Sequence, residues 1–152
     1  MLTRKLLDSF KHALRGAGFC IKNERNFRVH LVAALTACLI APYYSFNLTQ
    51  VILLVLVIAL VLICEMFNTA IEAAVDLTVK EFDALAKKAK DVSAGAVFVA
   101  ALCAVICGLF LFLRPEALHR IARDVVSSPY KAGAAAVYCA ASYLFVKGFD
   151  QK

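Results

Sequence analysis

The feature that most constrains this chain is an apolar run from Val51 to about Leu77 whose second half carries an acidic stripe. The run holds no charged residue before Glu65. At about 100° per residue, helical steps place the stripe within an arc of roughly 80° on one face; its members are Glu65, Asn68, Glu72 and Asp76. An ionisable group at membrane depth costs at least ~2.5 kcal/mol even on the most lenient insertion scale, so such groups face a bundle interior, a partner charge or a metal. The run therefore predicts a membrane helix with a functional face.

The composition of the whole chain points to the same class. Hydrophobic residues make up 62% of the 152 residues and the mean hydropathy is +0.78, whereas a soluble domain is ~45–50% apolar. We therefore expect one small all-α integral membrane protein. The net charge of +6 suits anionic headgroups or an anionic substrate such as a nucleotide. Nucleic acid is not an expected partner, because no soluble element carries a basic stripe interleaved with aromatic residues.

Apolar periodicity divides the chain into a membrane domain and an extension. The membrane domain, residues 1–113, is expected to hold an amphipathic surface helix at 3–22 and three spans at about 29–44, 51–77 and 92–113. The extension, residues 114–152, is expected to hold a short amphipathic helix at 116–128 and an apolar run at 132–146. That run is shorter than the ~17–25 residues of an ordinary span. A short fourth membrane helix or re-entrant helix is favoured for it, and a helix packed on the surface stays the alternative.

The basic residues predict the orientation in the membrane. Seven Lys and Arg residues precede the first span, none lies between Pro42 and Gln50, and four lie between the second and third spans. By the positive-inside rule, the N-terminus and the segment 78–91 are cytoplasmic, so the open end of the acidic stripe faces the ATP-containing compartment. Three spans would leave the basic residues of the extension outside, which is a mild conflict with the same rule; these are Arg114, Arg120 and Arg123.

The polar residues near the cytoplasmic end of the expected spans are those that phosphoryl transfer would need. Glu24, just before the first span, and Glu72 are expected at comparable depth, where a divalent ion such as Mg²⁺ between them would offset their repulsion. Glu65 lies deeper and suits a base that takes a proton from a lipid hydroxyl. Lys90 and Asp91 add a cation for phosphate oxygens and an acceptor beside it. From pattern alone, an ion or proton path and a polar network that merely fixes helix packing stay open.

Several common site motifs are absent. The six glycines form neither G-x-x-x-x-G-K-[ST] nor G-x-G-x-x-G, so a phosphate site must be built from carboxylate-bound Mg²⁺ and basic side chains. The three histidines, His12, His30 and His119, are too dispersed for a zinc site. For His30 we favour a hydrogen-bonding role near the interface over a ligand role.

The run from Glu65 to Asp76, Glu-Met-Phe-Asn-Thr-Ala-Ile-Glu-Ala-Ala-Val-Asp, closely resembles the signature of the small prokaryotic diacylglycerol kinase family of integral membrane lipid kinases. Three further segments agree in order and spacing: residues 9–13, 23–30 and 89–97. The resemblance implies a homotrimer of three-span subunits with active sites shared between neighbouring chains. Such a protein uses Mg-ATP to phosphorylate a membrane lipid alcohol, and it resides in the bacterial cytoplasmic (inner) membrane.

Carried over by position, the resemblance also implies roles for individual residues. Glu65 looks like the general base, Glu24 and Glu72 like the Mg²⁺ ligands, and Asn68 like a substrate-orienting amide. The residues that look like nucleotide contacts are Asp76, Lys90 and Asp91, together with an N-terminal basic residue for which Arg4 is chosen and Lys5 stays open.

Two features refine this resemblance. Residues 24–30 are more similar to the undecaprenol kinase branch than to the diacylglycerol kinase branch, which favours undecaprenol as the substrate, with diacylglycerol a close second. The extension after Arg114 departs from the family pattern. The rival functions are a small ion or proton carrier that uses the same stripe and a non-catalytic membrane scaffold.

Overall fold

The computed structural model describes residues 2–78 and 83–148, with side chains from residue 6 onward. Within these residues the chain is helical and contains no strand, which confirms the all-α prediction. The elements are α1 (Leu2–Asn23), α2 (Arg25–Ile40), the 3₁₀ helix η1 (Ala41–Tyr44), α3 (Leu48–Thr78), α4 (Ala84–Phe112), α5 (Pro115–Val126) and α6 (Pro129–Lys147).

Three helical segments are long and apolar enough to cross a membrane. They comprise α2 with η1, then α3, then α4, in agreement with the three expected spans. Local sequence explains how α3 begins: Asn47 Oδ1 accepts a hydrogen bond from the Gln50 amide and Gln50 Oε1 accepts one from the Asn47 amide, at 2.9 and 3.0 Å. This reciprocal pair satisfies amides that a helix start leaves without intrahelical partners.

The third spanning helix begins earlier than the sequence suggested. We expected a polar loop as far as Asp91, but α4 starts at Ala84. Asp83 caps it, because its Oδ1 accepts hydrogen bonds from the amides of Leu85 and Ala86 at 2.7 and 3.1 Å. At 1.5 Å per residue, the 29 residues of α4 exceed the ~30 Å hydrocarbon core, so its charged first turns extend beyond the core.

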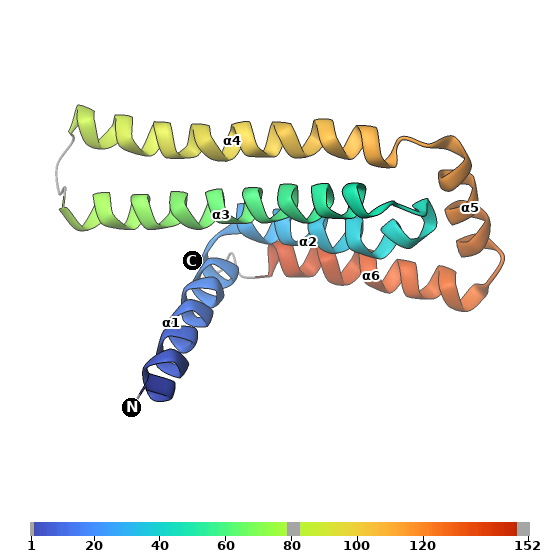
Figure 1. Cartoon of the computed structure of the whole chain (residues 1–152), viewed down its shortest axis with the longest axis horizontal. Helices are drawn as coiled ribbons and strands as arrows, with labels where there is room; N and C mark the ends of the chain where they lie inside the picture. Colours follow the sequence, from blue (N-terminus) through green and yellow to red (C-terminus); the bar gives the residue numbers. More distant parts are fainter. Residues whose placement is uncertain (1, 79–82, 149–152) are drawn as a thin grey trace.

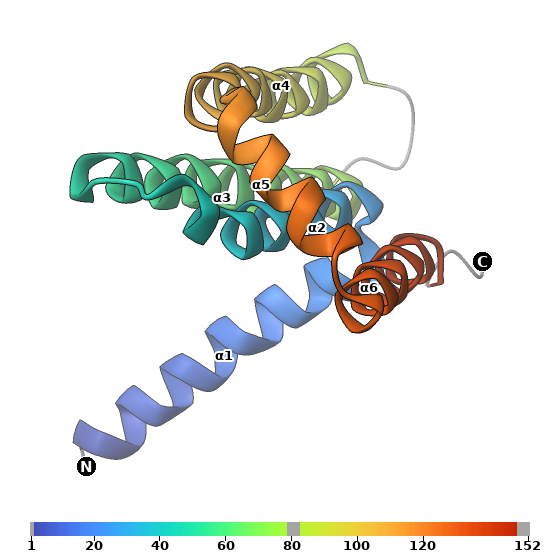
Figure 2. The same cartoon turned by 90° about the vertical axis from the view of Figure 1, so that its right-hand side faces the viewer.

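The helices form a layered bundle (Figure 1). Helices α3 and α4 run antiparallel along most of their length, α2 packs on α3, and α6 packs on α2. Helix α5 crosses the end of the bundle and joins α4 to α6 (Figures 1 and 2). The C-terminal end of α6 returns to the level of the α1–α2 junction, where Glu24 lies.

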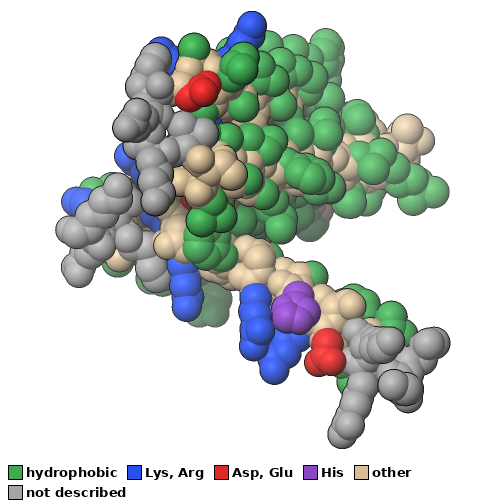
Figure 3. All heavy atoms as spheres, turned by 90° about the vertical axis from the view of Figure 1, so that its left-hand side faces the viewer, with side chains coloured by type: hydrophobic (Ala, Val, Ile, Leu, Met, Phe, Trp, Pro, Cys, Tyr) green, Lys and Arg blue, Asp and Glu red, His purple; other side chains and the backbone are tan. Residues whose placement is uncertain are grey.

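Much of the apolar surface of α3 and α4 faces outward (Figure 3). Large side chains such as Val55, Phe98 and Phe110 are 58%, 69% and 82% exposed. An apolar exterior of this extent is typical of a protein surrounded by lipid or by further membrane helices.

Helix α1 leaves the bundle at an angle (Figure 2). Its apolar side chains Leu7, Phe10 and Leu14 are exposed, and Lys11 and Arg15 are exposed between them. This is the pattern expected of a helix that lies on a membrane surface. Helix α6, which we favoured as a fourth membrane helix, is not among the three candidate spans.

Candidate active site

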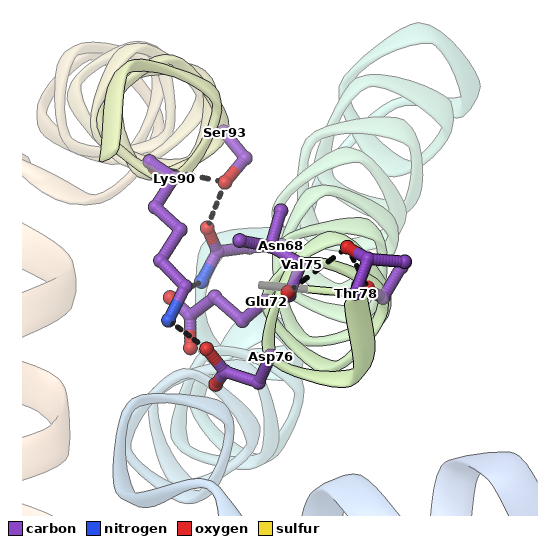
Figure 4. A network of polar contacts seen from close by, with 8 residues as sticks. Asn68, Glu72, Val75, Asp76, Thr78, Lys90 and Ser93 are labelled. Atoms are coloured by element: carbon purple, nitrogen blue, oxygen red, sulfur yellow. Dashed lines mark hydrogen bonds and ion pairs between the residues drawn. The ribbon is translucent and has the colours of Figure 1, made fainter. Parts of the chain in front are cut away.

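A hydrogen-bond network joins α3 to α4 at the centre of the acidic stripe (Figure 4). The buried hydroxyl of Ser93 donates to Asn68 Oδ1 at 2.7 Å or to the carbonyl of Lys90 at 2.9 Å. The amide nitrogen of Asn68 in turn donates to Glu72 Oε1 at 2.9 Å. Because its amide is held from both sides, Asn68 has a fixed orientation, with its nitrogen toward the carboxylate.

An ion pair lies at the open end of the acidic stripe. Lys90 Nζ lies 2.5 Å from Asp76 Oδ1, and the two side chains are 36% and 67% exposed. Ion pairs with this much exposure contribute little to stability. The pair therefore places a cation and a carboxylate at the entrance of the site and leaves both accessible to a charged ligand.

Glu65 is the most buried of the described acidic residues, at 2% exposure. His30 Nε2 of α2 approaches Glu65 Oε1 to 3.2 Å, in an alignment outside hydrogen-bond geometry. Within the described residues, Oε1 has no hydrogen-bond donor. Buried polar atoms without a partner are rare in folded proteins, and each calls for an explanation. One explanation is that this carboxylate is kept available for a hydroxyl of a substrate.

An apolar cavity of about 190 Å³ extends from His30 between α2, α3 and α4. Its α2 wall consists of small side chains, Ala33, Ala34 and Ala37, and aliphatic side chains of α3 face them. The site thus has a polar end at Lys90 and Asp76 and an apolar end beyond His30. A molecule with a polar head and a hydrocarbon chain would match this site, with its head at the polar end and its chain at the apolar end.

Glu24 and Glu72 are within electrostatic range of one another. Partial burial raises the pKa of Glu24 above its ordinary value, the negative charge of Glu72 raises it further, and Arg28 opposes the shift. Two carboxylates that repel each other across a gap are a donor set that a hard divalent cation would bind. Among the described residues, no group of three or more His, Cys, Asp and Glu side chains is arranged to hold a metal. Mg²⁺ commonly uses one or two carboxylates and takes its other ligands from water and substrate phosphates, so the pair fits this ion.

The structure brings some predicted site residues together but not all of them. Glu24, Glu65, Asn68, Glu72, Asp76 and Lys90 surround one region at the same end of the bundle. Asp91 is exposed on α4 next to Lys90 and forms no side-chain hydrogen bond or ion pair within the described part of the chain. The side chains of Arg4 and Lys5 lie outside the described residues.

Sequence reasoning missed two contributors to the site. No role was assigned to Ser93, although it lies three residues after Lys90 and therefore on the same helix face. His30 was expected to hydrogen-bond near the interface, whereas its imidazole contacts the deepest acid. Its presence inside an apolar run was the available signal.

The sequence is similar to known proteins over the helices that build this site. The profile of the family described as prokaryotic diacylglycerol kinase matches residues 11–112. That range contains α2, α3, α4 and half of α1, hence every site residue above except Arg4 and Lys5. Helices α5 and α6 lie outside it.

Individual relatives agree with the profile. The chain is 42% identical over 111 residues to a diacylglycerol kinase of Synechocystis sp., which covers 72% of this chain and 63% of that relative. It is 38% identical over 109 residues to the undecaprenol kinase of Bacillus subtilis, covering 72% and 89%. It is 36% identical over 104 residues to the diacylglycerol kinase of Escherichia coli, covering 64% and 85%. The chain thus spans less than two thirds of the length of the Synechocystis relative.

Proposed function

Since this chain belongs to the prokaryotic diacylglycerol kinase family, we propose that it transfers the γ-phosphoryl group of Mg-ATP to the hydroxyl of a membrane lipid alcohol. The observation that carries this proposal is the position of Glu65, a buried carboxylate without a hydrogen-bond donor among the described residues. It lies between a charged entrance at Lys90 and an apolar cavity. A base between a nucleotide site and a lipid site is what a lipid kinase needs.

In the proposed reaction, the hydrocarbon chain of the lipid lies on the apolar side and its hydroxyl approaches Glu65. Glu65 takes the hydroxyl proton while the oxygen attacks the γ-phosphorus in line. The bond between the γ-phosphorus and the bridging oxygen breaks, ADP leaves, and Glu65 releases its proton to solvent. Asn68, fixed by Ser93, orients the reacting groups.

Charge on the triphosphate is balanced from both sides of the site. Lys90 would exchange its contact with Asp76 for phosphate oxygens, since an exposed ion pair costs little to break. Asp91 and Arg4 complete the proposed nucleotide contacts. Glu24 and Glu72 would hold Mg²⁺, which when bound screens the negative charge of the phosphates.

Orientation and assembly are part of the same proposal. The basic residues before the first span and between the second and third support an orientation in which this end of the bundle faces the cytoplasm from the bacterial inner membrane, where ATP is available. The outward apolar surfaces of α3 and α4 would pack against further copies in a homotrimer whose sites are shared between subunits.

An ion or proton carrier is the alternative, and the distribution of polar groups argues against it. An ion path needs polar groups through the thickness of the membrane. The polar residues of α3 gather toward one end, and the cavity beyond His30 is lined almost entirely by apolar side chains.

Undecaprenol is the proposed substrate, with diacylglycerol a close second, because residues 24–30 are more similar to the undecaprenol kinase branch. The test is a side-by-side assay of purified protein with [γ-³²P]ATP, Mg²⁺ and each alcohol. We expect label in a chloroform-soluble product, and faster labelling with undecaprenol. Ion flux through liposomes without ATP consumption would support the carrier instead.

A further inference from the structure

Helices α5 and α6 lie outside the region that the family profile matches, yet they are attached to α2 and the adjoining η1 at three levels. At the end near α5, the Tyr43 hydroxyl donates to Asp124, whose second oxygen accepts from Lys131. In the middle, the hydroxyls of Thr36 and Tyr138 lie 2.8 Å apart. At the other end, Arg28 donates to the carbonyl of Val146 through Nε at 3.3 Å and Nη2 at 3.1 Å.

These contacts keep one antiparallel register along the two helices. The step from Arg28 to Thr36 on α2 is eight residues, as is the step back from Val146 to Tyr138 on α6. Because both helices rise by the same amount per residue, equal steps keep the partners opposite one another. Helix α6 therefore docks in one fixed position rather than sliding along an apolar surface.

Apolar burial does not explain this docking. None of the residues of α6 is fully buried. The contacts that define its position are directional hydrogen bonds, and those of Arg28 involve a side chain with 0% exposure. Hydrogen bonds of this kind specify geometry more than they add stability.

Arg28 connects α6 to the junction between α1 and α2. Its side chain is fully buried, with 0% exposure. Besides the carbonyl of Val146, its Nη1 donates to the carbonyls of Ile21 and Lys22, at 3.3 and 3.2 Å. Carbonyls in the last turn of a helix have no intrahelical partner and carry partial negative charge. One guanidinium thus caps the C-terminal ends of both α1 and α6.

Glu24 lies at the junction between α1 and α2, next to the end of α1 that Arg28 caps. It is the single residue that separates α1 from α2, its backbone is extended, and it precedes Arg28 by one helical turn. We propose that α6 acts as a clamp that, through Arg28, fixes the α1–α2 junction and positions Glu24 opposite Glu72. This inference rests on the proposed function only where it gives Glu24 a role in binding Mg²⁺.

The structural part of the clamp is tested by hydrogen–deuterium exchange on two truncated proteins in detergent. A chain that ends at Ala141 lacks the Val146 carbonyl, whereas a chain that ends at Gly148 keeps it and serves as the matched control. We expect amides in residues 19–30 to exchange roughly tenfold faster in the shorter chain, with residues 97–107 of α4 unchanged. Arg28→Lys provides a second variant, because an ammonium group cannot reproduce the planar fork that reaches both helix ends.

The positioning part is tested by titrating Mg²⁺ in the kinase assay. For the Ala141 chain and Arg28→Lys, we expect the half-saturating Mg²⁺ concentration to rise roughly tenfold, the usual scale for loss of a partner that orients a metal ligand. The KM for the lipid should stay unchanged, and the two changes combined should have no greater effect than either alone.

The outcomes separate the clamp from the proposed function. The exchange measurement needs no ATP, lipid or metal. An inactive full-length protein would therefore refute the kinase proposal, while the exchange data would still test the clamp. Unchanged exchange at residues 19–30 in both variants would overturn the clamp. Faster exchange with an unchanged Mg²⁺ requirement would overturn its role in positioning Glu24.

Discussion

His30 Nε2 lies 3.2 Å from Glu65 Oε1, so an imidazole on α2 contacts the most buried acid on α3. The two residues are 35 positions apart, and His30 also lines the apolar cavity. The contact gives the proposed base a neighbour that limits where its carboxylate can point.

Replacing this neighbour should slow the chemical step. We expect His30→Ala to lower kcat about tenfold, equivalent to about 1.4 kcal/mol, because the Glu65 carboxylate would lose the neighbour that limits where it points. The KM for ATP should not change, because His30 is on the apolar side of Glu65. Steady-state kinetics check this, with His119→Ala on α5 as the control. A normal kcat would remove His30 from the site.

The exposed cation at the entrance should act on nucleotide binding. Lys90→Met is expected to raise the KM for ATP roughly tenfold or more, because a charge-assisted contact to phosphate is lost. Thermal stability should hardly change, since the ion pair with Asp76 is largely exposed. Lys88→Met, an exposed lysine on the same helix, is the matched control. Equal KM values for the two variants would place the nucleotide elsewhere.

The buried hydroxyl of Ser93 should matter through Asn68. Ser93→Ala leaves Asn68 Oδ1 without this donor and frees the amide to rotate away from Glu72. We expect kcat to fall about tenfold, because a partly buried acceptor that loses its donor costs about 1 kcal/mol or more. Ser127→Ala, at an exposed hydroxyl, controls for general effects. Activity within twofold of the control would show that Asn68 needs no support from α4.

The raised pKa of Glu24 predicts a pH-dependent cost in the metal-free protein. Burial and then the charge of Glu72 raise the pKa of Glu24 in the folded state, so protonation favours folding and stability from this group falls as pH rises above the ordinary value of ~4.3. At pH 7 in EDTA, Glu24→Gln should therefore have a higher melting temperature than the parent, and the difference should vanish below that value. Thermal unfolding in detergent measures this, with Glu116→Gln as control. A lower melting temperature for Glu24→Gln would contradict the sign.

Two parts of the site were predictable because they follow from helical periodicity or from membrane depth. The stripe from Glu65 to Asp76 follows from helical periodicity, and the proximity of Glu24 to Glu72 follows from membrane depth. The contact of His30 with Glu65 depends on how α2 is rotated against α3, which spacing within either helix does not encode.

Two parts of the fold were harder to predict because each depends on individual side chains rather than on a repeating pattern. The early start of α4 depends on one capping side chain, Asp83, in a segment whose charges suggested a loop. The docking of α6 depends on single polar residues within apolar runs, Thr36 and Tyr138, whose pairing is a property of the tertiary structure.

The most direct test of the account is the turnover of purified Glu65→Gln with Mg-ATP and lipid alcohol, measured beside Glu116→Gln. Glutamine keeps the size and polarity of the side chain but cannot take a proton. We predict that ³²P transfer to lipid falls at least ~10²-fold, the scale of general base catalysis, while nucleotide binding persists. Turnover close to that of the Glu116→Gln control would contradict it.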